Sequence, residues 1–250
     1  MPAASIDNWQ TMQYIMMPLD AHYDSGFGAI AESFRDAALA LKKAVPNPAF
    51  FDHLPQSYLF RHATELFLKS EIVILHRKLK LAYGTEPYKG EPMVLAQGEW
   101  KPIHRVHSIG ILYEYWKSLI NPRLDALKEM TKYKADWTII DGADDWVKTI
   151  EGVDPRSTYS RYPSVRDPRE DQAKSSFRAA TAEELFPENA PEDRRIMALI
   201  IENDDHEFIK GYVNERGVEP DQAYMDALEA MCDMLHAYHA MMRFELTAGF

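Results

Sequence analysis

The stretch that decides the fold is Tyr58-Leu59-Phe60-Arg61-His62-Ala63-Thr64-Glu65-Leu66-Phe67-Leu68-Lys69. At about 100° per residue, Arg61, Glu65 and Lys69 fall within an arc of roughly 80° on a helix, one turn apart in sequence. Apolar side chains fill most of the remaining circumference. Such a helix is typical of the centre of a bundle, and its charged side chains must find partners on neighbouring elements or line a site, because an unpaired buried charge is costly.

Composition limits the class of protein. The chain has 250 residues, of which 46% are hydrophobic, so we expect a single domain over residues 1–250. No apolar run is long enough for a membrane span, and the sequence MPAASIDNWQ lacks the features of a signal peptide, so we expect a cytoplasmic protein with no membrane partner. The net charge of -11 argues against broad, non-specific binding to nucleic acid. The single cysteine, Cys232, excludes an intrachain disulfide and a cysteine-based zinc site.

Helical periodicity dominates the chain. It predicts helices over about residues 28–44, 55–82, 109–120, 123–133 and 144–151, and a last amphipathic helix that begins near Pro220-Asp221. The fold class that we predict is therefore all-α, an up-and-down helical bundle.

Three segments do not follow this periodicity. Residues 83–102 are rich in Gly and Pro and indicate a loop excursion or a hairpin-like insertion. Residues 152–180 predict a long, irregular loop rich in Arg and Tyr, and long loops in compact domains are often functional. Residues 196–201 are ambiguous between helix and strand, and Pro191-Glu192-Asp193 before them favours a helix.

The charged ladder of Arg61, Glu65 and Lys69, with His62 beside it, is the first candidate site. In a functional interpretation, Arg61 binds an anion while Glu65 orients Arg61 or takes a proton. In the alternative interpretation, the ladder is an interior ion-pair network that links helices.

The sequence His104-Arg105-Val106-His107-Ser108 is the second candidate. Its two histidines and its arginine gather where a helix begins, and Ser108 is a plausible N-cap. Histidine exchanges protons near neutral pH and a helix N-terminus attracts anions, so this segment could perform acid–base chemistry on a phosphate. A solvated, cationic start of a helix is the alternative.

The segment from Asp154 to Pro163 is the third candidate. Arg161 and Tyr162 could contact phosphates and stack on a base. Alternatively, the segment is a loop pinned by Arg161 to a carboxylate such as Glu65.

Metal binding is the fourth alternative, through Asp233, His236 and His239 or through residues 204–207. A zinc site needs three or four converging ligands, which these patterns do not establish. Glu229, Asp233 and His236 face away from the apolar stripe of the last helix, which favours a solvated face. We therefore predict no metal and no cofactor. The sequence contains no GxGxxG, Walker A, HExxH, GxSxG or CxxC pattern.

A combination of motifs is more specific than any one of them. The helix with Arg61-His62-Ala63-Thr64-Glu65-Leu66-x-Leu68-Lys69, His107 before an apolar helix, and the segment from Val153-Asp154-Pro155 to Arg161-Tyr162-Pro163 together resemble prokaryotic HEPN-like proteins. The resemblance covers about residues 51–163, with a weaker match in the last helix. It implies an all-helical bundle, a homodimer, and kinship with metal-independent ribonucleases of toxin–antitoxin and antiviral systems. The Arg-x4-6-His motif of the catalytic members is absent from this sequence.

We therefore expect a HEPN-like, nucleotide- or RNA-interacting protein of a bacterial stress or defence module, with RNA or a nucleotide as ligand and a second copy or a cognate protein as partner. In its enzymatic form it is a metal-independent endoribonuclease that uses Arg61, Glu65 and His107. Substrate contacts then come from five further residues: His62, Lys69, His104, Arg161 and Tyr162. The alternative is a non-catalytic, dimeric interaction or regulatory protein whose charged ladder is structural.

Overall fold

The computed structural model describes residues 14, 16–44, 53–133, 135–162, 174, 177–187, 196–215 and 222–249. Its helices are α2 (Phe27–Ala44), α3 (His53–Leu79), α4 (Ile109–Ile120), α5 (Leu124–Met130), α6 (Ala143–Val153), α8 (Ala182–Leu185) and α9 (Gln222–Leu246). Short 3-10 turns lie at Leu19–Ala21, Ile103–Arg105 and Asn121–Arg123. The strands are β1 (Met93–Ala96), β2 (Glu99–Pro102), β3 (Arg178–Ala180), β4 (Ile196–Glu202) and β5 (Phe208–Glu215).

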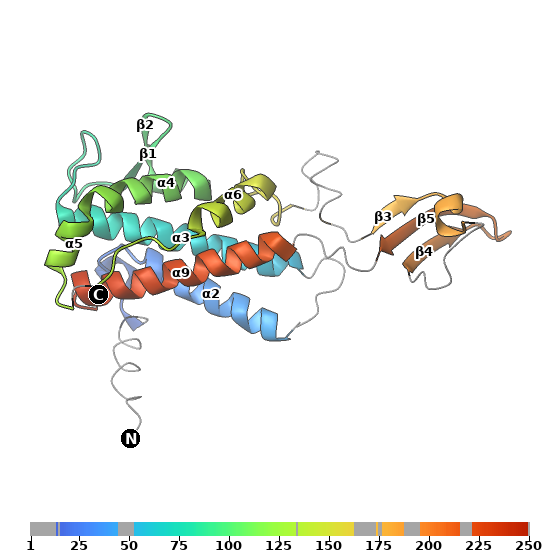
Figure 1. Ribbon diagram of the computed structural model, residues 1–250, viewed down its shortest axis with the longest axis horizontal. Coiled ribbons are helices and arrows are strands. Elements are labelled where there is room, and N and C mark those ends of the chain that lie inside the picture. The colour runs from blue at the N-terminus through green and yellow to red at the C-terminus, as the bar shows by residue number, and fades with distance from the viewer. Residues whose placement is uncertain are drawn as a thin grey trace, which may run out of the picture.

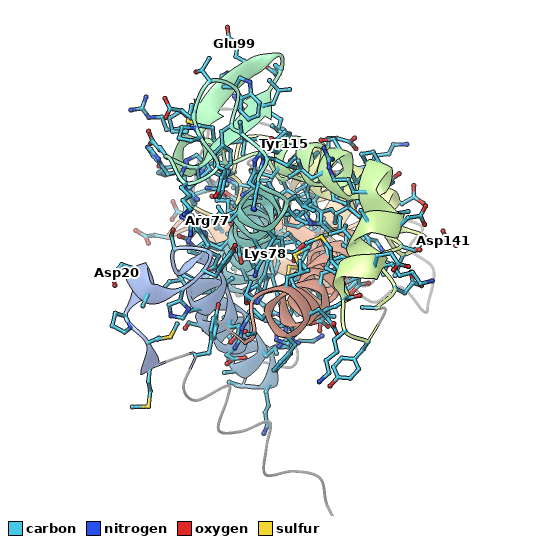
Figure 2. The ribbon with its side chains drawn as sticks, turned by 90° about the vertical axis from the view of Figure 1, so that its left-hand side faces the viewer. Asp20, Arg77, Lys78, Glu99, Tyr115 and Asp141 are labelled. Carbon is cyan, nitrogen blue, oxygen red and sulfur yellow. The ribbon has the colours of Figure 1, made fainter. Side chains whose placement is uncertain are left out.

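Helix α3 is the central element of the helical bundle. Helices α2, α9 and α4 all pack against it, and Figure 2, which looks along the bundle, shows α3 surrounded by them. Between Phe60 and His76 every residue of α3 except His62 is buried. A helix buried on all sides has no solvated face for its charged side chains, so those of α3 must be paired inside the protein.

A β-hairpin projects from the bundle between α3 and α4 (Figure 1). Strands β1 and β2 are antiparallel, with Ala96 opposite Glu99, so that Gln97 and Gly98 alone form the turn. Both turn residues have positive φ, 54° and 85°, as a two-residue hairpin turn with the correct twist requires.

A second, three-stranded sheet corrects the predicted fold class. Strands β3, β5 and β4 form an antiparallel sheet in that order, and helix makes up 58% and strand 13% of the structure. The protein is therefore mixed α/β, and the all-α prediction is wrong. The predicted helix over residues 196–201 is also wrong, because these residues form β4. Their unbroken apolar run has no helical period, and strand β5 is available to pair with it.

This sheet has a small core of its own. Ala180, Leu185 and Val213 form a hydrophobic cluster separate from that of the bundle. A Cβ atom added to Gly211 of β5 would lie 2.2 Å from Leu185 Cδ1, so glycine allows α8 to pack closely against the sheet. In Figure 1 the sheet lies beyond one end of the bundle. None of the described helices combines the length and the apolar character that crossing a membrane demands.

Candidate functional site

The guanidinium of Arg61 lies at the centre of the candidate site. Its Nε is 2.9 Å from Asp154 Oδ2, and its terminal nitrogens donate to Ser157 Oγ at 2.7 Å and to the His107 carbonyl at 3.0 Å. Glu65 Oε2 is 3.5 Å away on the same helix. The Arg61 side chain is only 2% exposed, so these protein groups surround it and leave it no access to a substrate.

The Glu65 carboxylate joins the ladder to a histidine at the surface. Its Oε1 accepts a hydrogen bond from Lys69 Nζ at 2.7 Å and lies 2.9 Å from His107 Nδ1. Burial raises the pKa of Glu65, but the Lys69 ammonium and the hydrogen bonds from Lys69 and His107 outweigh it, so the pKa falls below its usual value. Glu65 is therefore a stable anion at neutral pH.

The buried part of this network is balanced in charge. Arg61 and Lys69 supply two positive charges, and Glu65 and Asp154 supply two negative ones, all on buried side chains. Balanced pairs with good geometry offset much of the cost of removing charges from water. The arrangement matches the interpretation of the ladder as an interior ion-pair network.

The network also holds the segment that follows α6 against α3. Asp154 Oδ1 accepts the backbone N–H groups of Thr158 and Tyr159 at 2.7 and 3.1 Å, so one carboxylate folds this segment and binds Arg61. The segment is thus pinned, but by Arg61 to Asp154, whereas we expected Arg161 to pin it to Glu65.

His107 is the member of the cluster that reaches solvent. Its side chain is 46% exposed, whereas the Glu65 side chain that holds Nδ1 is 1% exposed. Ser108 caps α4 as predicted, by accepting the Ile111 N–H at 3.1 Å. The N-terminus of α4 does not offer a free anion site, because Glu151 Oε1 already accepts the Gly110 N–H at 2.9 Å.

Aromatic and cationic groups lie on the same face of α3, one to two turns before Lys69. His62 stacks on Tyr58 with an interplanar angle of 7°, and the Arg161 guanidinium lies over the Tyr58 ring, 5.6 Å from its centroid. Burial lowers the pKa of His62, and Arg161, Lys69 and Arg61 lower it further, while Glu65 acts in the opposite direction. His62 is therefore neutral at physiological pH.

Two other predicted residues stay outside this cluster. His104 lies in the 3-10 turn before α4, and its Nδ1 is 3.7 Å from Glu91 Oε1. Tyr162 exposes its ring, and its carbonyl accepts a hydrogen bond from Lys174 Nζ at 2.7 Å. Neither residue contacts Arg61, Glu65 or Lys69 through any printed hydrogen bond or ion pair among the described residues.

The described residues hold no group of three or more side chains placed to bind a metal. On α9, Asp233 pairs with Arg35 of α2 at 2.7 Å and Glu229 pairs with Lys42. This face of α9 is thus partly covered by salt bridges to α2, whereas we predicted a solvated face. His239 is fully buried.

A second buried cluster escaped the sequence analysis. His239 of α9 lies between two carboxylates, 3.7 Å from Asp24 Oδ2 and 3.6 Å from Glu32 Oε1, and its Nε2 is 3.3 Å from the Tyr14 hydroxyl. Asp24 also accepts the Gly28 N–H at the start of α2. His239 follows Leu235 by one helical turn, which places it on the buried stripe of α9, and this spacing was the available signal.

Comparisons with known protein families, with curated protein sequences and with solved structures found no match to this chain. The resemblance to HEPN-like proteins therefore depends on the motifs quoted above. Residue roles have to be argued from the geometry of the cluster around Glu65 and His107.

Proposed function

We propose that this chain is a HEPN-like protein of a bacterial stress or defence module that binds RNA or a nucleotide and cleaves RNA without a metal, with His107 as the proton-transfer residue. The observation that supports it is the contact of 2.9 Å between Glu65 Oε1 and His107 Nδ1, in which a buried anion holds a half-exposed imidazole. A carboxylate in this position fixes the orientation of the ring and stabilises its protonated form.

The proposed chemistry follows from the nitrogen that remains. Because Glu65 engages Nδ1, Nε2 is the ring atom of His107 left to exchange a proton. In metal-independent cleavage of RNA, the 2′-oxygen attacks the phosphorus, the bond to the 5′-oxygen breaks, and a 2′,3′-cyclic phosphate forms. His107 would accept the proton of the 2′-hydroxyl or donate one to the leaving 5′-oxygen, and such proton transfer contributes about 10²- to 10⁴-fold.

The ligand contacts are assigned to the surface beside His107. Tyr58 and His62 present stacked rings, which suit a base, and Arg161 supplies a positive charge for a phosphate. Arg61 acts as a positioning residue in this proposal, because its buried guanidinium holds the His107 carbonyl. Lys69 plays a similar part through Glu65.

A second candidate function is a non-catalytic interaction or regulatory protein. The balanced, enclosed charges of Arg61, Glu65, Lys69 and Asp154 favour it, because they account for the ladder as a structural network. In that case His107 has no role beyond the surface.

The experiment compares wild type, His107→Ala and His206→Ala with total RNA in the presence of EDTA. His206 is an exposed histidine between β4 and β5, so its replacement is a matched control. The proposal expects cleavage by wild type and by His206→Ala, and a loss of at least about 10²-fold in His107→Ala. Absence of cleavage by wild type, or full cleavage by His107→Ala, would exclude the proposed chemistry and favour the second candidate.

A further inference from the structure

Strand β4 presents an unprotected apolar edge. It is the last strand in the order β3-β5-β4, so its outer edge has no partner strand among the described residues. No charged residue interrupts Met197–Ile201, and the side chains of this segment are exposed: Met197 53%, Leu199 55%, Ile200 37% and Ile201 41%. Soluble proteins usually protect such edges with lysine, proline or a bulge, because an open apolar edge pairs with other chains.

The register with β5 separates the two faces of β4. Ala198 and Ile200 lie opposite Val213 and Gly211, which face the covering helix α8. Side chains alternate along a strand, so Met197, Leu199 and Ile201 share the other face. These three residues form a stripe of exposed apolar side chains, which we call the β4 stripe.

The sheet has little else to stabilise it. Its own core consists of Ala180, Leu185 and Val213. A small sheet needs a hydrophobic face buried against another element to be stable, and the exposed β4 stripe is the largest apolar surface that this sheet offers.

We infer that β4 pairs in antiparallel fashion with β4 of a second copy of this chain. If the pairing is centred on Leu199, each Leu199 lies opposite its counterpart, and Met197 of each copy lies opposite Ile201 of the other. The two β4 stripes then become one continuous apolar surface on a six-stranded sheet. Residues directly opposite in antiparallel strands share a face, so the strand matches itself in this register.

The charges that flank β4 in sequence favour the same orientation. Arg194 and Arg195 precede the strand, and Asp204 and Asp205 follow it. Arg194 and Asp204 stand five positions on either side of Leu199, so antiparallel pairing brings the arginines of one copy to the aspartates of the other. A parallel arrangement would instead place like charges together.

Disulfide formation in the full-length chain tests both the occupant and the register. Leu199→Cys should form an interchain disulfide on mild oxidation, because directly opposite Cα atoms are about 4.5–5.5 Å apart in antiparallel strands. Met197→Cys is the control, since its counterpart would be offset by four residues, or about 13 Å. The native Cys232 is buried and serves as the same background in both variants. Equal cross-linking of both variants, or of neither, would overturn the proposed pairing.

Light scattering after size-exclusion chromatography provides the second measurement. Wild type should be a dimer, and Leu199→Arg a monomer with unchanged helical circular dichroism. Met130→Arg, at an exposed apolar position on α5, should remain a dimer. A monomeric wild type, which would leave β4 to a strand of another protein, or a dimeric Leu199→Arg would overturn the inference. Neither measurement depends on RNA cleavage.

Discussion

Arg61 Nε lies 2.9 Å from Asp154 Oδ2, and this buried ion pair joins the centre of α3 to the segment that follows α6. Asp154→Ala would leave the Arg61 guanidinium without its main anion and the segment without its internal hydrogen bonds. We expect a loss of about 3–5 kcal/mol in the free energy of unfolding, the usual cost of breaking one side of a buried pair. Urea denaturation followed by circular dichroism measures it.

The exposed pair between Arg35 and Asp233 is the matched control for this prediction. Its atoms are closer, at 2.7 Å, but the Asp233 side chain is 48% exposed. Asp233→Ala should therefore cost less than about 1 kcal/mol. Equal losses in the two variants would mean that burial does not decide the strength of these pairs.

Local patterns predicted the elements of the bundle well. The ladder from Arg61 to Lys69 indicated a buried central helix, and Ser108 was identified as the cap of α4 because capping depends on a few adjacent residues. Strand β4 could not be predicted in this way, since a short apolar run fits a helix or a strand until its pairing partner is known.

The partners of buried charges were harder to predict. We expected Arg161 to pin the segment that contains Asp154, but Arg61 does so across 93 residues of sequence. His239 likewise meets Asp24 through contacts between the two ends of the chain. Such pairs are set by how the helices pack, and a single sequence carries no local pattern for them.

Glu71 of α3 makes stability depend on pH. It is fully buried, and neither of its carboxyl oxygens has a hydrogen-bond partner among the described residues. Burial raises its pKa well above the usual value, and the nearby Trp116 indole does not offset this. The stability that its neutral form allows is present below the unfolded pKa of about 4.3 and is lost as pH rises through the folded pKa, at about 1.4 kcal/mol for each unit between the two.

Glu71→Gln removes this titration. Relative to wild type, the variant should gain stability steadily as the pH is raised from 4 to 8, as measured by urea denaturation across that range. Glu114→Gln, on the exposed face of α4, should show no such trend. A constant difference between Glu71→Gln and wild type at every pH would refute the proposed neutral carboxyl.

His239 should contribute stability with the opposite partner chemistry. Burial lowers its pKa, but hydrogen bonds and charges from Asp24 and Glu32 raise it by more, while Arg243 and His236 lie nearby. A raised pKa means that this contribution is complete below the unfolded value of about 6.5 and disappears as pH rises through the folded pKa. His239→Gln should therefore cost about 1–3 kcal/mol at pH 6 and clearly less at pH 9.

The measurement is thermal or urea denaturation at the two pH values. His206→Gln, at an exposed position, should change stability by less than about 0.5 kcal/mol at both. If His239→Gln costs as much at pH 9 as at pH 6, the imidazole is not charged in the folded protein.

Gly28 and Gly152 should respond in opposite ways to alanine. A Cβ atom on Gly28 would lie 2.0 Å from His239 Nε2 and 2.7 Å from the Tyr14 hydroxyl, so Gly28→Ala must displace the buried cluster. We expect a loss of about 1–3 kcal/mol, as for other overpacked cores. Gly152 lies in α6 with no atom within 4 Å of an added Cβ, so Gly152→Ala should gain about 0.5–1 kcal/mol by restricting the unfolded chain. Because both changes add one methyl group to a helical glycine, a stable Gly28→Ala variant in urea denaturation would contradict the close approach of α9 to α2.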